Sequence, residues 1–163
     1  MPALVLLVAL APPLYRLGVG AQIRRLFASL NRHDWSPVTA NLASEFTYEF
    51  HGDTAIGGVR RRRETVDAWF ERVFRVLPDA RFELRDVVVG GPPWNTRVAI
   101  HASIAGNLAD GTPYSNVFQQ RVVVRWAKVR SIETIEDTQK LDRAMRALAA
   151  SGFEEAVAAP LVD

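Results

Sequence analysis

Hydrophobic and polar positions change their spacing along this chain, and the spacing separates helices from strands. Apolar residues recur at intervals of three and four over about residues 14–31, which predicts an amphipathic helix. Ser36 and Pro37 begin a second, short helix, because Ser caps helices and Pro fits in the first turn. A third helix, which ends at Pro78, is indicated by Val66, Trp69, Phe70, Val73, Phe74 and Leu77.

Alternating patterns predict the strands. One strand, Glu45–His51, interrupts the helices. After Pro78, four more strands form a meander, at residues 81–89, 96–106, 114–126 and 129–136. A hairpin turn is expected at Asp110–Gly111 and a tight turn at Ala127–Lys128. Asp137 then caps a closing helix. This order predicts an α+β fold in which a strongly curved antiparallel or mixed sheet wraps around the N-terminal helices, forming a cone with an internal cavity.

The length of 163 residues fits one domain with a core of its own. We divide the chain into an N-terminal apolar extension (1–13), the cone domain (14–151) and a C-terminal tail (152–163). The apolar run Ala3–Ala11 is shorter than the roughly 20 residues that a membrane span needs. We expect it to remain in the mature protein and to pack on protein; the alternative is a degenerate secretion signal.

Several functions are disfavoured by what the sequence lacks. Cysteine is absent, which fits a cytoplasmic location, and the three histidines have no metal-ligand spacing, so we expect no metal site. No dinucleotide loop, phosphate loop or nucleophile elbow occurs, so we expect no cofactor. The net charge of +2 is small, and the run Arg60–Arg63 is interpreted as a solvated loop rather than a nucleic-acid patch.

Strand alternation places a set of polar side chains inside the predicted cavity. On the long strand, Asn116 and Gln120 share a face with Phe118 and Trp126. On the other strands the expected inward residues are Tyr48, Phe50, Asp86 and Thr134, with His51 near the mouth. An apolar pocket with a few convergent polar groups is the usual form of a small-molecule site.

A carboxyl group buried among apolar residues has a raised pKa and can carry a proton. We therefore name Asp86, His51 and Tyr48 as candidate catalytic residues. Candidate ligand-binding residues are Asn116, Gln120, Phe118, Trp126, Trp69, Phe50 and Thr134. Each candidate also has a purely structural interpretation. Asp86 can face outward and pair with arginine, and His51 can be an ordinary loop residue. Tyr48 and Trp69 can fill the core, and the amides of Asn116 and Gln120 can bridge strands.

The chain resembles the nuclear transport factor 2-like superfamily, in its SnoaL-like branch. The resemblance covers about residues 20–150 and is diffuse. It is carried by Phe27–Asp34, Phe50-His51-Gly52 with Gly57-Gly58, Trp69-Phe70 with Pro78-Asp79, Asp110-Gly111, and Lys128-Val129 leading to Asp137–Leu141. It implies the cone fold and a range of functions: polyketide cyclases, ketosteroid isomerases, limonene-epoxide hydrolases and non-catalytic binding or association domains.

The residues that these enzymes use are mostly replaced here. Phe27 stands where the isomerases have a tyrosine, and their general-base aspartate falls near Phe50. Arg121 is followed by two valines where the epoxide hydrolases have Arg-x-Asp, and their second aspartate falls near Thr134. We expect a small-molecule-binding protein that acts as a cofactor-independent isomerase or cyclase by proton transfer. The alternative is a non-catalytic ligand-binding or dimerisation module.

The partners expected are a small apolar molecule with a polar group and a second copy of the chain, with no nucleic acid and no membrane. The homodimer is predicted because the outer sheet face is too apolar to be fully wet. Its apolar residues are Val117, Val123, Ala99 and Ala105, which lie among Arg97, His101, Arg121 and Arg125.

Overall fold

The helices and strands follow the predicted order. The structure is a computed structural model that describes residues 2–163, with side chains from residue 14 onward. The helices are α1 (Pro2–Leu30), α2 (Ser36–Ala40), α3 (Arg63–Val76), α4 (Thr138–Ala150) and the 3-10 turn η1 (Glu154–Val157). The strands are β1 (Leu42–Phe50), β2 (Gly58–Arg60), β3 (Arg81–Gly90), β4 (Thr96–Asn107), β5 (Pro113–Arg125) and β6 (Lys128–Glu136).

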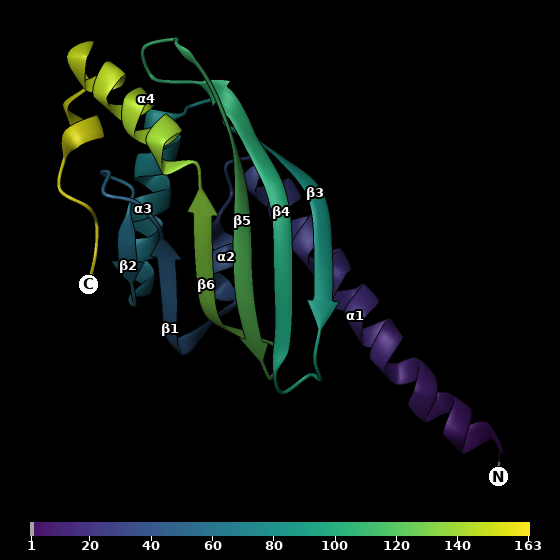
Figure 1. The fold of residues 1–163 in the computed structure, drawn as a ribbon. Helices are drawn as coiled ribbons and strands as arrows, with labels where there is room; N and C mark the ends of the chain where they lie inside the picture. Colours follow the sequence, from purple (N-terminus) through teal and green to yellow (C-terminus); the bar gives the residue numbers. More distant parts are fainter. Residues whose placement is uncertain (1) are drawn as a thin grey trace.

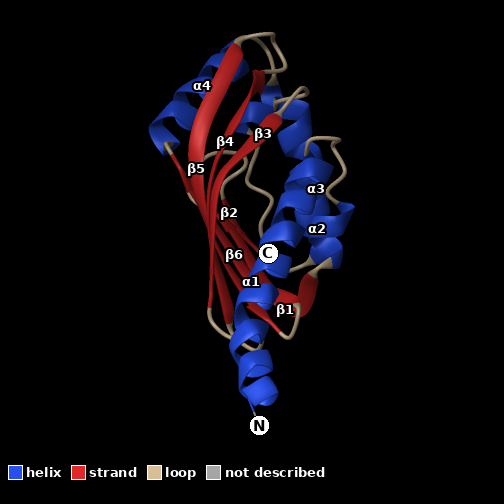
Figure 2. Ribbon diagram, turned by 90° about the vertical axis from the view of Figure 1, so that its right-hand side faces the viewer, coloured by secondary structure: helices blue, strands red, loops and turns tan. Residues whose placement is uncertain are grey.

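The six strands form one open, mixed sheet in the order β2-β1-β6-β5-β4-β3. β1 pairs parallel with β6, and the other neighbours are antiparallel (Figure 1). Figure 2 shows the curved sheet with α1, α2 and α3 on one side. The core lies between this inner face and the helices, which confirms the predicted α+β cone.

A β-bulge in β3 changes which side chains face the core. Leu84 pairs with Ala102, but Asp86 pairs with His101, so β3 carries one extra residue at this point. Because side chains alternate, the extra residue reverses the faces that follow it. Asp86 is consequently exposed. The prediction that its carboxyl group faces the cavity was wrong.

The turn between β5 and β6 also lies one residue earlier than predicted. Arg125 pairs with Lys128, so the turn residues are Trp126 and Ala127, with φ of 50° and 60°. Trp126 is 74% exposed. It lies past the end of the strand, which is why the inward placement inferred from alternation was wrong.

Local signals for the short elements were partly correct. Asp137 caps α4 as predicted, its side chain accepting a hydrogen bond from the backbone N–H of Lys140. Ser36 is instead the first helical residue of α2, and the Asp34 carboxylate accepts from both its N–H and its hydroxyl. The edge strand β2 was not predicted; three residues carry too little alternation to be recognised.

The C-terminal tail packs on the domain. Glu155 pairs with Arg75 at 2.6 Å, and the backbone N–H of Asp163 donates to the Val59 carbonyl at 3.3 Å. The division of the chain into three segments stays a prediction. The side chains of the Ala3–Ala11 run lie outside the described residues. Within the part of the chain that the structure describes, no helix is long and apolar enough to cross a bilayer.

Candidate functional site

A narrow apolar cavity of about 80 Å³ lies between the inner sheet face and the helices. It is smaller than the roughly 300–1,000 Å³ of drug-sized sites, so it suits a compact molecule. Six of the predicted site residues line it: Tyr48, Phe50, Trp69, Phe118, Gln120 and Thr134.

An aromatic wall forms one side of the cavity. The Trp69 ring lies 5.1 Å from the Tyr48 ring and 5.8 Å from the Phe50 ring, measured between centroids. Its indole N–H donates to the Ile56 carbonyl at 2.7 Å, which fixes the ring. Burial raises the pKa of the Tyr48 phenol far above its ordinary value, so this hydroxyl stays protonated and can donate a hydrogen bond.

Arg60 lies behind this wall with its side chain fully buried. It is the cross-strand partner of Tyr48, and its guanidinium lies 5.0 Å from the Trp69 ring centroid. The guanidinium donates to the carbonyls of Ile56, Gly57 and Gly58 at 2.6–3.0 Å. Arg60 therefore holds the loop that carries Ile56 against the cavity.

A polar pair lies on the sheet floor. Gln120 and Thr134 are cross-strand partners on β5 and β6, and the Gln120 amide donates to the Thr134 hydroxyl at 3.0 Å. This leaves the Gln120 carbonyl oxygen and the Thr134 hydroxyl hydrogen as groups that can contact a ligand.

A second polar group was missed by the sequence analysis. Glu136, the last residue of β6, lines the cavity together with Tyr114. The Tyr114 hydroxyl lies 3.5 Å from Oε1 of Glu136 and accepts from the Asn116 amide at 3.0 Å. Asn116 also donates to the Asp137 carbonyl at 3.1 Å. Asn116 is thus buried as predicted, but it supports Tyr114 and is not part of the cavity lining.

The electrostatics of Glu136 suit proton transfer. Burial raises the pKa of its carboxyl group to about 7, against the opposing effect of hydrogen bonds from Tyr114 and Asn116. Both protonation states are then populated near neutral pH. Burial and the neighbouring Glu136 raise the pKa of Tyr114, which keeps its hydroxyl a donor.

The signal for Glu136 and Tyr114 was present in the sequence. Glu136 shares a face with Ile132 and Thr134, and Tyr114 shares one with Asn116 and Phe118. Both residues lie at strand ends, where the alternating pattern is weakest.

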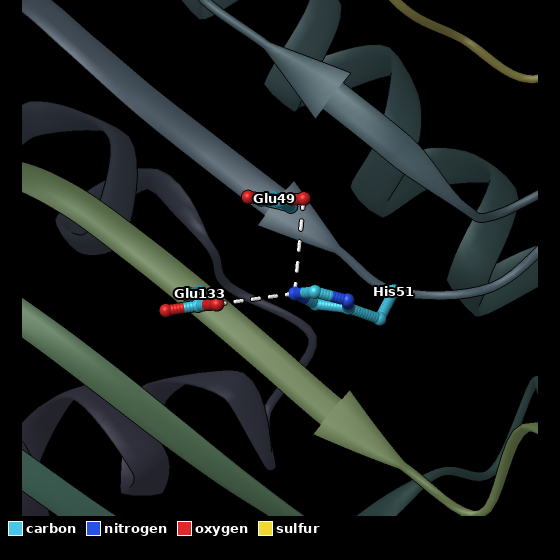
Figure 3. Close-up of side chains that lie close together, drawn as sticks. All are labelled: Glu49, His51 and Glu133. Carbon is cyan, nitrogen blue, oxygen red and sulfur yellow. Dashed lines mark hydrogen bonds and ion pairs between the residues drawn. The ribbon is translucent and has the colours of Figure 1, made fainter.

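Three predicted site residues lie away from the cavity. Asp86 and Trp126 are exposed for the reasons given above, and His51 points to the outer face of the sheet. There the imidazole Nε2 lies 3.2 Å from Glu133 Oε1 and 3.7 Å from Glu49 Oε1 (Figure 3). The expected position of His51 at the cavity mouth was therefore wrong.

The cluster of Glu49, His51 and Glu133 has the donor atoms of a divalent-cation site. One atom from each residue lies within 4.8 Å of the others. Arg121, however, already lies 2.6 Å from the second oxygen of Glu133. All three cluster residues are partly exposed, so the cluster is adequately explained as a surface ion-pair network.

Residues 23–132 match the model of the SnoaL-like domain. The protein therefore belongs to the SnoaL-like family of the nuclear transport factor 2-like superfamily, as its resemblance predicted. No curated protein matches the chain.

Solved structures show the same fold at low identity. PrhC from Penicillium brasilianum has a TM-score of 0.71 at 17% identity, over 86% of this chain and 93% of its own. An NTF2-like protein of unknown function from Burkholderia pseudomallei has 0.66 at 16%, over 76% and 94%. A protein with a ketosteroid isomerase-like fold from Catenulispora acidiphila, in complex with trimethylamine, has 0.60 at 18%, over 70% and 83%.

Proposed function

We propose that this protein binds a small, largely apolar molecule with a polar group in the cavity and moves a proton on it, with Glu136 as the acid–base group. The observation that carries the proposal is the Glu136 carboxyl group in an apolar cavity, with a pKa raised to about 7 by burial. A base works best when its pKa lies near the working pH.

The chemistry follows from the arrangement of the polar groups. The Glu136 carboxylate removes a proton from a carbon next to a carbonyl group. Returning that proton to another atom isomerises the molecule. Attack of the resulting carbanion on a second carbonyl instead closes a ring, and the alkoxide formed takes back the proton from Glu136. Tyr114 orients the carboxyl group, and Tyr48, Gln120 and Thr134 offer hydrogen bonds to ligand oxygens. Asp86 and His51 have no part in this proposal.

The test uses cyclohexanone in deuterium oxide, because loss of an α-proton is the first step of both reactions. We expect the wild type to speed exchange of the α-hydrogens, followed by proton NMR. Glu136→Gln should lower that rate by about 100-fold or more. Glu133→Gln is the matched control, since Glu133 lies on the same strand but on the outer face. Equal rates for the wild type and Glu136→Gln would rule out Glu136 as the base.

The alternative is a non-catalytic binding module, which the replacements at Phe27 and Phe50 favour. It predicts that cyclohexanone shifts resonances of cavity residues without any acceleration of exchange. Binding without exchange would therefore replace the enzymatic proposal with the binding one.

A further inference from the structure

Two exposed tryptophans lie side by side at one end of the sheet. Trp94, in the β3–β4 connection, is 56% exposed, and Trp126, in the β5–β6 turn, is 74% exposed. Their ring centroids are 6.3 Å apart, and the backbone N–H of Trp126 donates to the Pro93 carbonyl at 3.2 Å. Large exposed apolar surfaces of this kind mark contact sites.

The backbone of the β5–β6 turn adopts a strained conformation at Trp126 and Ala127. Trp126 and Ala127 have φ of 50° and 60°, a region in which such turns favour Asn or Gly. A turn of ordinary composition would avoid both the strain and the exposed ring. Local strain that the rest of the fold sustains is typical of functional positions.

Helix α1 reaches the same end of the molecule. The Tyr15 hydroxyl lies 2.6 Å from the Thr96 hydroxyl, at the start of β4 next to the Trp94 loop. Leu14 and Leu17 of this helix are 64% and 69% exposed. The preceding part of α1, which contains the apolar run Ala3–Ala11, extends beyond this end of the sheet (Figures 1 and 2).

Most charged residues at this end are basic, and the acidic Glu45, near the start of β1, lies 4.0 Å from Arg130. Exposed cations accompany the tryptophans and the helix, at Arg16, Arg97, Arg125 and Lys128. No Asp or Glu occurs in the first 33 residues, between Asp86 and Asp110, or between Asp110 and Glu133. The start of α1, the β3–β4 connection and the β5–β6 turn therefore combine apolar, aromatic and basic side chains without acidic ones.

We propose that this end of the protein docks on the surface of a bilayer that contains anionic lipid. Tryptophan favours the level of the headgroups, an apolar helix can lie in the interface, and basic residues are attracted to anionic headgroups. The proposal departs from the sequence-based expectation of no membrane partner. That expectation rests on the short length of the apolar run, and an interfacial helix need not span the bilayer.

The test is co-sedimentation of the full chain with vesicles. We expect binding to vesicles of three parts phosphatidylcholine and one part phosphatidylglycerol, a blue shift of tryptophan emission, and weaker binding to phosphatidylcholine alone or at high salt. Replacing both tryptophans (Trp94→Ser, Trp126→Ser) should weaken binding about tenfold or more. The matched control is Val157→Ser with Val162→Ser, two exposed apolar residues in the C-terminal tail.

A second variant tests the charge. Arg125→Gln with Lys128→Gln should remove the preference for phosphatidylglycerol, and circular dichroism should show that every variant is folded. The proposal is overturned if the wild type does not bind vesicles, or if the double tryptophan variant binds as well as the control. It is also overturned if the same tryptophans drive self-association without lipid, which would make this end an interface between copies.

Discussion

The Tyr114 hydroxyl lies 3.5 Å from Oε1 of Glu136, at the point where the start of β5 and the end of β6 meet beside the cavity. The two residues come from strands that are not joined at this end. Pairing of β5 with β6 brings them together, with Phe118 opposite Glu136. Tyr114 is thus fixed by Asn116 on its own strand while it contacts the carboxyl group on the next.

The first prediction concerns stability and pH. Burial raises the folded-state pKa of Glu136 to about 7, against an ordinary value of 4.5. Between these values the folded state binds more protons than the unfolded state, so this group makes the free energy of unfolding fall as pH rises from about 4.5 to 7, with no further loss above that. The full effect is about 3 kcal/mol at most.

Glu136→Gln removes this titration. We expect the variant to gain stability relative to wild type as pH rises through that window. Urea unfolding of both proteins at a series of pH values measures the difference. A difference that does not change with pH would show that Glu136 titrates normally in the folded protein.

The second prediction concerns the polar pair on the sheet floor. Gln120→Leu removes the amide that donates to Thr134 and that can contact a ligand oxygen. Affinity for cyclohexanone should fall about tenfold or more while the fold persists. Gln119→Leu is the matched control, because that amide lies on the outer face. NMR titration measures both affinities, and equal losses in the two variants would contradict a ligand contact at Gln120.

The third prediction concerns the buried arginine. Arg60→Met removes the side-chain donor from the carbonyls of Gly57 and Gly58, whereas the Ile56 carbonyl keeps the Trp69 indole N–H. Each group left unsatisfied costs about 1–3 kcal/mol. We expect a loss of about 3 kcal/mol or more in the free energy of unfolding. Arg143→Met, on the exposed side of α4, should change it by less than about 0.5 kcal/mol. Chemical denaturation of the two variants decides the point.

The fold was predictable because its periodic signals are long. The strands of the meander alternate over many residues, and Asp137 marks the start of α4. The site was less predictable, because a single inserted residue in β3 moved Asp86 to the outer face. The local sequence does not predict the position of the bulge or of the turn at Trp126, because both depend on how the strand pairs with its neighbour.

The fourth prediction concerns the outer-face ion pairs. Glu49 and Glu133 are directly opposite each other across β1 and β6, and like charges in that position destabilise a sheet. His51 lies between them, so His51→Ala should cost about 0.5–1 kcal/mol. Glu49→Gln should reduce that cost, because less repulsion remains. A double-mutant cycle measured by urea unfolding gives the coupling, and a zero coupling would contradict this account.

The last prediction concerns the homodimer, which we propose to form through the outer face of the sheet. Val117 and Ile135 are 42% and 51% exposed there, and Ala99 and Ala105 are also exposed. An arginine at the centre of such a face must be desolvated without a partner when two copies meet. We expect the wild type to sediment at twice the 18.1 kDa of one chain, and Val117→Arg to shift the protein to the single-chain mass. Val157→Arg, in η1 and 65% exposed, adds the same charge elsewhere and should leave the dimer intact. Sedimentation of the wild type as a monomer at micromolar concentration would show that this face serves another purpose.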